Sequence, residues 1–212
     1  MISIGKQAFA YCSYAESVII GNHVKTIGEM AFTYCPRLES VTLGEGVETI
    51  DNSAFYSCSI LNEIVIPNNV KIIGESAFES CGQLKSITLG ECVETIGNYA
   101  FSGCNVMADI YIHTSTAIEI PENTFNNNCY KKATLHIPSG SLKSYAETRY
   151  WNSFAHIVDD IEPSGILQPT ALDEHLTIFD MKGNRLPHFV PGINIVKYKN
   201  GRKKKYIFNL SK

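Results

Sequence analysis

Cysteine is the residue type in this chain whose spacing most invites a chemical interpretation. Five of the seven cysteines recur at a constant step of 23 residues, namely Cys12, Cys35, Cys58, Cys81 and Cys104. The chain contains no CxxC pair, so the spacing does not predict zinc. If these cysteines sit on stacked strands, neighbouring Cα atoms lie about 4.8 Å apart, within disulfide range, but their parallel Cβ vectors oppose bonding. We therefore expect free, buried thiols in this column, with Cys92 and Cys129 outside it.

The remaining reactive side chains do not form a catalytic pattern. The six histidines are scattered, and the chain has no HExxH, no GxSxG and no phosphate-binding or dinucleotide-binding glycine loop. His113 is expected in a solvated turn, and His136 on the outward side of a strand. The outward carboxylates Glu63 and Asp109 should lie about 9–10 Å apart, a poor acid/base pair. The sequence thus predicts a protein that is not an enzyme and holds no metal or cofactor.

The elements that position these residues follow the same 23-residue period. Phenylalanine recurs in register with the cysteines, at Phe9, Phe32, Phe55, Phe78 and Phe101, each after an alanine. A period held over five copies predicts a solenoid, in which each 23-residue turn, called a coil below, stacks on its neighbours. The aromatic rings should then form a buried ladder, and each should contribute roughly 2–3 kcal/mol.

One coil, residues 38–60, illustrates the local prediction. Leu38–Leu43 ends in an alternation of apolar and polar residues, which is typical of a strand with one buried face, and Gly44 ends that strand in a turn. Ile50 should point inwards, and the Gly or Asp that follows it in each coil should adopt a positive φ at a sharp corner. A short helical or 3₁₀ turn should then carry Ala54 and Phe55.

The solenoid is expected to span residues 1–160 and to end in a cap. The coil after Phe101 is stretched by an insertion near Asn126–Asn128. Residues 139–148 are expected to form a helix whose inward face carries Leu142, Tyr145 and Ala146. Because a terminal coil must cover its open apolar end, we assign the cap to residues 139–158, which include the aromatic residues Trp151 and Phe154.

Beyond a linker at 161–171, residues 172–212 have a different character. Two apolar runs, 176–179 and 193–198, are expected to be strands of a small antiparallel β domain, and Asn200-Gly201 predicts a two-residue hairpin. The basic run Arg202–Lys205 could bind a polyanion, but a charged edge strand that resists edge-to-edge pairing is the better interpretation.

Composition excludes some classes of partner and leaves the compartment open. A net charge of −3 gives no electrostatic case for nucleic acid or an anionic membrane, and no apolar run reaches transmembrane length. No signal peptide opens the chain. Because Met1-Ile2-Ser3-Ile4 starts in the middle of a coil, we expect that the natural protein begins further upstream and has lost its leader.

The coil pattern I-G-x-x-A-F-x-x-C…L-x-x-I-x-L resembles the BspA-like leucine-rich repeats of bacterial surface proteins, over residues 2–158. The cap also resembles that family's usual ending, through Pro138, Gly140, Tyr145, Trp151 and Phe154. The chain departs from better-known leucine-rich repeats in lacking a regular asparagine ladder after the strand. The resemblance implies an α/β-type leucine-rich repeat solenoid with parallel strands. It also implies secretion or surface display, adhesion and protein binding.

The tail resembles the short C-terminal sorting domains of type IX secretion in Bacteroidetes. The matching residues are Phe179, Asp180, Gly183 and Arg185, followed by the run Pro191–Val196 with Gly192. This resemblance implies that the tail is an export address, and that the protein is extracellular or at the outer cell surface.

The outward side of the repeating strands is the predicted binding surface. Its residues are Ser40, Thr42, Glu63, Val65, Ser86, Thr88, Asp109, Tyr111, Thr134 and His136. Tyr111 is the expected anchor, because aromatic residues dominate binding energy where they become buried. We expect a monomeric, non-enzymatic module that binds a protein or an extracellular-matrix-type macromolecule, or else a glycan. The alternative is an accessory carbohydrate-binding protein, which would need clustered carboxylates or stacked exposed aromatic rings.

Overall fold

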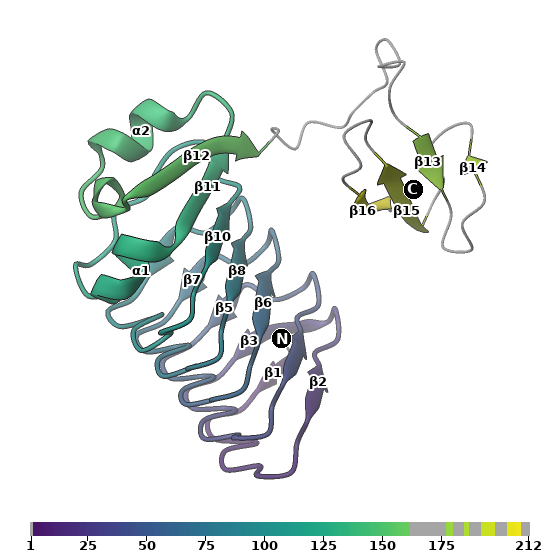
Figure 1. Ribbon diagram of the computed structural model, residues 1–212. Helices are drawn as coiled ribbons and strands as arrows, with labels where there is room; N and C mark the ends of the chain where they lie inside the picture. The colour runs from purple at the N-terminus through teal and green to yellow at the C-terminus, as the bar shows by residue number, and fades with distance from the viewer. Residues whose placement is uncertain (1, 162–176, 180–184, 187–191, 198–202, 209–212) are drawn as a thin grey trace. The chain divides into compact units, whose positions relative to one another are not determined.

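The computed structural model describes residues 2–161 and four short stretches near the C-terminus, 177–179, 185–186, 192–197 and 203–208. The chain divides into two compact units, Met1–Ser164 and Gly165–Lys212. In the first unit the chain winds through stacked coils with parallel strands on two sides (Figure 1). This confirms the predicted solenoid of parallel strands.

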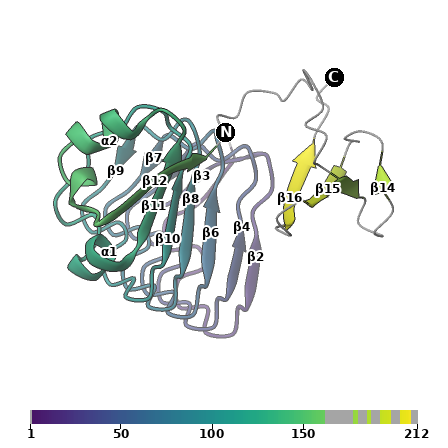
Figure 2. The same cartoon turned by 45° about the horizontal axis from the view of Figure 1, so that its top comes forward.

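One side of the solenoid is a parallel sheet with the order β6-β8-β10-β11-β12, and the two-stranded sheet β2-β4 lies beside β6 (Figure 2). Partner residues in neighbouring coils are 23 apart, as for Ile64 and Ile87. Alternation buries Ile64 and turns Glu63 and Val65 outward. The strands are Ser17–Ile19 (β2), Ser40–Thr42 (β4), Glu63–Ile66 (β6), Ser86–Leu89 (β8), Asp109–Ile112 (β10), Thr134–Pro138 (β11) and His156–Ile161 (β12).

The other side carries a second parallel sheet of shorter strands, in the order β1-β3-β5-β7-β9. Val47 and Ile50 point inwards as predicted, and both are fully buried. The pairing of strands here was not predicted, because two to four residues per coil are too few to show an alternation. These strands are Ile2–Ile4 (β1), Val24–Ile27 (β3), Thr49–Ile50 (β5), Ile72–Ile73 (β7) and Thr95–Ile96 (β9).

The Gly or Asp after each of these short strands does not adopt the predicted backbone conformation. Positive φ values do not occur there but two and six positions later, for example at Ser53 and Ser57. A Cβ on Gly74 would lie 2.5 Å from the backbone nitrogen of Asn52 in the preceding coil. The predicted positive φ is therefore wrong: glycine is needed at Gly74 because the backbones of stacked coils approach closely.

The long turn that carries the Ala-Phe pair is not helical. The Ala54 N–H donates to a carbonyl of its own coil at 3.2 Å, whereas the Phe55 N–H donates to the next coil at 2.8 Å. Because Ser53 and Ser57 have φ values of 54° and 57°, alternate peptide groups turn toward the neighbouring coil. A helix would keep its hydrogen bonds within one coil. The prediction of a helical or 3₁₀ turn is thus wrong, and main-chain bonds connect the stacked turns instead.

The phenylalanine ladder is confirmed. Successive rings from Phe9 to Phe101 are nearly parallel, with centroids 5.2–5.5 Å apart and interplanar angles of 2–8°. Phe125 of the stretched coil adds a sixth ring at 5.4 Å from Phe101. Phe55 is fully buried, whereas Phe9 in the first coil is 47% exposed.

The cysteine column is buried as predicted, with one change in its membership. Each thiol from Cys35 to Cys104 donates to a phenylalanine carbonyl of the preceding coil at 3.2–3.4 Å. Cys12 is only partly buried because it lies in the first coil. Cys129, predicted to lie outside the column, is buried and donates to the Cys104 carbonyl at 3.4 Å.

Thiol labelling at pH 8 should therefore separate the cysteines into two groups. Burial raises the pKa of Cys81 to about 12 and that of Cys129 to about 11, so both stay as unreactive neutral thiols. We expect exposed Cys92 to react first, and Cys58, Cys81, Cys104 and Cys129 to react at least about 100-fold more slowly until urea unfolds the protein. Mass spectrometry of the labelled peptides gives each rate. Rapid labelling of Cys58 in the native state would contradict the buried column.

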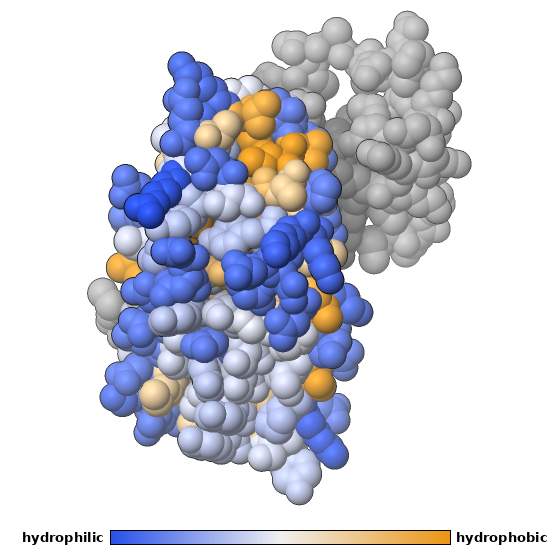
Figure 3. Space-filling model, turned by 60° about the vertical axis from the view of Figure 1, so that its left-hand side comes forward, coloured by the Kyte–Doolittle hydropathy of each residue, from blue (hydrophilic) through white to orange (hydrophobic). Residues whose placement is uncertain are grey.

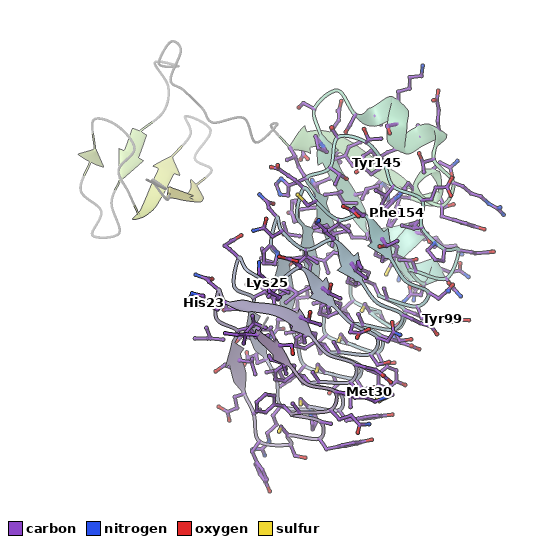
Figure 4. All side chains as sticks on the ribbon, turned by 180° about the vertical axis from the view of Figure 1, so that it is seen from behind. His23, Lys25, Met30, Tyr99, Tyr145 and Phe154 are labelled. Atoms are coloured by element: carbon purple, nitrogen blue, oxygen red, sulfur yellow. The ribbon has the colours of Figure 1, made fainter. Side chains whose placement is uncertain are left out.

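The stretched coil and the cap close one end of the solenoid. The insertion forms α1 (Asn127–Lys132), whose N-cap Asn126 accepts a hydrogen bond from the Cys129 N–H at 2.9 Å. The chain then passes through β11, α2 (Leu142–Glu147) and the 3₁₀ turn η1 (Trp151–Ser153), and returns to the sheet as β12. Tyr145 and Phe154, labelled in Figure 4, are both buried.

The predicted inward face of the cap helix is wrong in part. Leu142 and Ala146 are exposed, and only Tyr145 of the predicted three is buried. The helix has six residues instead of the predicted ten, so it presents a single large side chain to the core. The apolar cover comes instead from Trp151, which is 1% exposed and whose Nε1–H donates to the Ile118 carbonyl at 2.7 Å.

The second unit contains one antiparallel sheet in the order β14-β13-β15-β16. Its strands are Thr177–Phe179 (β13), Arg185–Leu186 (β14), Gly192–Lys197 (β15) and Lys203–Phe208 (β16). Lys197 pairs with Lys203, and the predicted Asn200-Gly201 hairpin turn lies outside the described residues. The predicted linker at 161–171 lies outside the described residues except for Ile161, which ends β12.

Candidate functional site

The predicted binding surface is one continuous face, formed by the outward side chains of β2, β4, β6, β8, β10, β11 and β12. We call it the docking face. The strand registers arrange it in two columns that run from coil to coil. The polar column contains Ser17, Ser40, Glu63, Ser86, Asp109, Thr134 and His156. The branched column contains Ile19, Thr42, Val65, Thr88, Tyr111, His136 and Val158.

The branched column leaves apolar side chains in solvent. Ile19 is 82% exposed, Val65 58% and Val158 40%. The sequence predicted Val65 but missed the other two. Ile19 could have been found, because it lies two repeats before Val65. Val158 could not, since β12 joins the sheet only after the cap has interrupted the period.

Tyr111 and His136 meet at the capped end of this face, as predicted. Their rings stack with centroids 4.4 Å apart and an interplanar angle of 15°. His136 Nδ1 lies 2.9 Å from Asp160 Oδ1, and its Nε2 lies 3.2 Å from Asp109 Oδ1. Sequence reasoning placed Asp109 and His136 on this surface but missed Asp160, which belongs to β12. Two carboxylates and a ring thus fix the imidazole, so the prediction of a simply exposed His136 is incomplete.

This cluster is suited to binding by contact. Burial raises the pKa of Tyr111 above its usual value, and the charges of Asp109 and Asp160 raise it further, so the phenol stays protonated and can donate a hydrogen bond. Among the residues that the structure describes, no group of three or more His, Cys, Asp or Glu side chains is placed to hold a metal ion. The arrangement therefore offers a rigid aromatic anchor with a polar edge, of the kind that dominates protein interfaces.

The opposite side of the solenoid carries paired charges. Lys25 Nζ lies 2.6 Å from Glu48 Oε1, and this contact holds the pKa of Glu48 below its usual value, with a further contribution from the charge of Lys71. Down the coils this column reads Lys25, Glu48, Lys71 and Glu94, an alternation of opposite charges. Figure 4 shows Lys25 projecting near His23 from that side. A surface that already neutralises its own charges is a weaker candidate for docking.

A third surface is formed by the long turns that follow β1, β3, β5, β7 and β9, and we call it the long-turn edge. It carries exposed aromatic residues that the sequence did not lead us to predict. Tyr11 and Tyr34 stack at 5.4 Å, and Tyr56 meets Tyr34 edge-on at 5.3 Å. Tyr11 is 65% and Tyr34 46% exposed. Met30 and Tyr99 project from the same edge in Figure 4. Figure 3, which brings the left-hand side of Figure 1 forward, shows a mostly white and blue surface, with its largest orange area near the top and small separate orange areas below. The signal was the aromatic residue one or two positions after Phe9, Phe32 and Phe55.

An open hollow of about 470 Å³ lies in the stretched coil, lined by Ser102, Glu122, Asn123, Phe125, Asn126 and Asn127. The Asn123 Oδ1 atom is buried there without a hydrogen-bond donor among the residues that the structure describes. None of the predicted site residues lines this hollow, so it is separate from the docking face.

Two solved structures share this fold. A leucine-rich repeat protein of T. pallidum is 26% identical with a TM-score of 0.53, and the match covers 64% of this chain and 67% of that protein. The pneumococcal vaccine antigen PcpA is 22% identical with a TM-score of 0.57, and the match covers 74% of this chain but only 39% of the antigen. No curated protein is significantly similar to the chain. No helix within the described part of the chain is long and apolar enough to cross a membrane.

The repeats themselves identify the family. The model of the family described as "BspA type Leucine rich repeat region" matches residues 2–133, in six copies of the repeat. That range holds the five regular rings of the phenylalanine ladder and the stretched coil that adds Phe125. The chain belongs to the BspA-type leucine-rich repeat family.

Proposed function

We propose that this protein is a non-enzymatic binding module, which attaches to a macromolecule through the docking face while it is secreted or displayed at the cell surface. The observation that carries the proposal is the branched column, which leaves Ile19, Val65 and Val158 exposed across two adjoining sheets, with the Tyr111–His136 pair between Val65 and Val158. Solenoids use such continuous faces to bind extended partners. Membership of the leucine-rich repeat family supports protein interaction, and the family resemblance supports a surface location.

Tyr111 should be the strongest single contact of this face. Once a partner is in hand, Tyr111→Ala should weaken binding by about 2 kcal/mol, roughly 30-fold, because it removes a rigid aromatic anchor. Glu79→Ala on the long-turn edge should change the affinity less than about twofold. Titration calorimetry of the two variants compares them directly. A larger loss for Glu79→Ala would place the binding surface on the long-turn edge.

Crosslinking from the docking face can capture a partner whose identity is unknown. A photo-crosslinking amino acid at Thr88 reports on the docking face, and the same group at Glu79 is the matched control. Extracellular extracts of host and microbial origin supply candidates. A species that is crosslinked from position 88 and not from 79, and that is lost in a Tyr111→Ala background, supports the proposal. Crosslinking from 79 alone would contradict it.

A second candidate function is glycan binding at the long-turn edge. Stacked exposed rings are the feature that a carbohydrate-binding protein requires, and Tyr11 and Tyr34 provide them, with the half-buried Tyr56 edge-on beside Tyr34. Tyrosine contributes an apolar ring face and a hydroxyl at the same site. In affinity electrophoresis through gels that contain soluble polysaccharides, Tyr34→Ala should abolish retardation. Tyr99→Ala is the control, because Tyr99 is exposed to a similar extent (43% against 46%) and also has a positive φ.

We further propose that residues 172–212 are an export address and contribute nothing to the docking face. Of the residues that resemble a sorting domain, Arg185 lies in β14 and Gly192 in β15, whereas Asp180 and Gly183 lie outside the described residues. Deletion of 172–212 should leave the melting temperature of the solenoid within about 2 °C of the full chain, since the solenoid forms its own compact unit. Surface display in the native host should be lost. Normal display of the truncated protein would contradict the sorting role.

A further inference from the structure

Resting on the proposed function, we infer that the partner of the docking face is an extended protein segment that presents basic and apolar side chains in alternation on one of its faces, at every second residue. The apolar part follows from the exposed Ile19, Val65 and Val158 of the branched column. The basic part follows from the charges on and around this face.

The docking face is acidic along its length. Neither of its two columns contains a lysine or an arginine, whereas Glu63 and Asp109 belong to the polar column and Asp160 lies at the end of β12. The residues that flank the strands extend this charge. Glu16 and Glu39 precede β2 and β4, Glu45 and Glu91 follow β4 and β8, and all four are exposed. The basic residues of these flanks are Lys85 before β8, Arg37 before β4, and Lys131 and Lys132 before β11.

Several carboxylates along this face and its flanks lack a cation, whereas Asp109 and Asp160 both contact His136. Glu63 forms no ion pair with any residue of the described chain, and neither do the flanking Glu16, Glu39, Glu45 and Glu91. On the opposite side, by contrast, Glu29 is 2.7 Å from Lys6 and Glu48 is 2.6 Å from Lys25. Both sides are built from the same coils. The difference in ion pairing therefore belongs to the two faces and does not reflect the overall composition of the coils. Unpaired charges of one sign attract a partner of the opposite sign.

The spacing suits an extended segment. Alternate side chains of an extended chain point to the same side and repeat every ~6.6–6.8 Å, so a segment that runs along a strand of the docking face can place an apolar and a basic group over residues two apart on that strand. Val65 and Glu63 lie two residues apart on β6 and both point outward. An apolar and a basic side chain of the partner can therefore meet this strand together. Nucleic acid and acidic peptides are excluded as partners by repulsion.

The test uses two synthetic dodecapeptides, fluorescently labelled: one repeats Lys-Thr-Val-Thr, so that lysine and valine alternate on one face, and the other has glutamate in place of lysine. Binding to the full chain is followed by fluorescence anisotropy at 50 and 300 mM NaCl. We expect the lysine peptide to bind and the glutamate peptide not to bind. Higher salt should weaken the binding at least fivefold, because exposed charges are screened.

Two matched double variants locate the interaction. Glu39→Gln/Glu63→Gln removes two charges from the docking face, and Glu29→Gln/Glu48→Gln removes two from the opposite side. We expect the first to weaken binding of the lysine peptide at least fivefold and the second less than twofold. All four positions are on the surface, and thermal melts check that each variant is folded. Equal losses in both variants would reveal a general charge effect and overturn the inference.

The outcomes also separate this inference from the proposed function. If the glutamate peptide binds, and Val65→Ser and Tyr111→Ala weaken that binding, the docking face is confirmed and the basic partner is wrong. If a peptide binds but neither substitution alters its affinity, the docking face itself is wrong. If the lysine peptide does not bind at 50 mM NaCl, the charge-based identification of the partner fails.

Discussion

Phe55→Ala is expected to lower the free energy of unfolding by about 3–5 kcal/mol, because it leaves a ring-sized cavity that the neighbouring coils cannot fill. Phe55 is fully buried and lies between two parallel rings, with centroids 5.2 Å from each. Each coil shares its interfaces with its neighbours, so the loss reaches beyond a single repeat. Urea titration followed by circular dichroism measures the effect.

The matched control is Phe9→Ala in the first coil. Phe9 occupies the same column but is 47% exposed and stacks on one ring instead of two. Its replacement should cost no more than about 1.5 kcal/mol, since less apolar surface leaves the core. A loss below about 1 kcal/mol for Phe55→Ala, or equal losses at the two positions, would show that the ladder does not stabilise the solenoid.

Trp151→Ala is expected to have an effect of similar size, about 3–5 kcal/mol, at the other end of the solenoid. Trp151 is 1% exposed and packs against Phe125, Tyr145 and Phe154. The substitution also leaves the Ile118 carbonyl without the indole N–H that lies 2.7 Å away. Because the last coil would then expose its apolar interior, we also expect aggregation, visible as light scattering on heating.

Leu142→Ala provides the control for the cap. Leu142 belongs to the same segment but is 45% exposed, so its replacement should cost less than about 0.5 kcal/mol. Both variants are compared by urea titration and by size-exclusion chromatography after mild heating. If Leu142→Ala destabilises the protein as much as Trp151→Ala does, the helix and not the indole closes the solenoid.

The sequence predicted the parts of the fold that repeat. A residue such as Phe55 lies against copies of itself 23 positions away, so the period alone predicts its neighbours and its burial. The local backbone was harder to predict. The Ala-Phe segment combines an alanine and an aromatic residue with no pattern that distinguishes a helical turn from alternating turns, and the positive φ values fall on Ser53 and Ser57, which do not favour them.

The candidate site was predictable up to the point where the period ends. Tyr111 and His136 are 25 residues apart, and the extra two residues belong to the insertion that leaves the strand register intact. Asp160 and Val158 were missed because β12 follows the cap, where no repeat indicates which residues face outward. Tyr34 was missed for another reason: a single exposed tyrosine is ordinary, and only the stacking of neighbouring coils makes it part of a cluster.

The alternating charges on the second side of the solenoid have a consequence for how such a chain can be lengthened or shortened. Lys25, Glu48, Lys71 and Glu94 repeat in identity every 46 residues, although the backbone repeats every 23. The turns that follow β2 and β6 show the same 46-residue repeat. Their Asn22 and Asn68 side chains accept hydrogen bonds from the backbone N–H groups of Glu45 and Glu91 in the next coil, at 3.1 and 3.2 Å. Removal of one coil would place Lys25 beside Lys71, whereas removal of two would restore a lysine beside a glutamate. The alternation of charge on this side is therefore kept only when coils are added or removed in pairs.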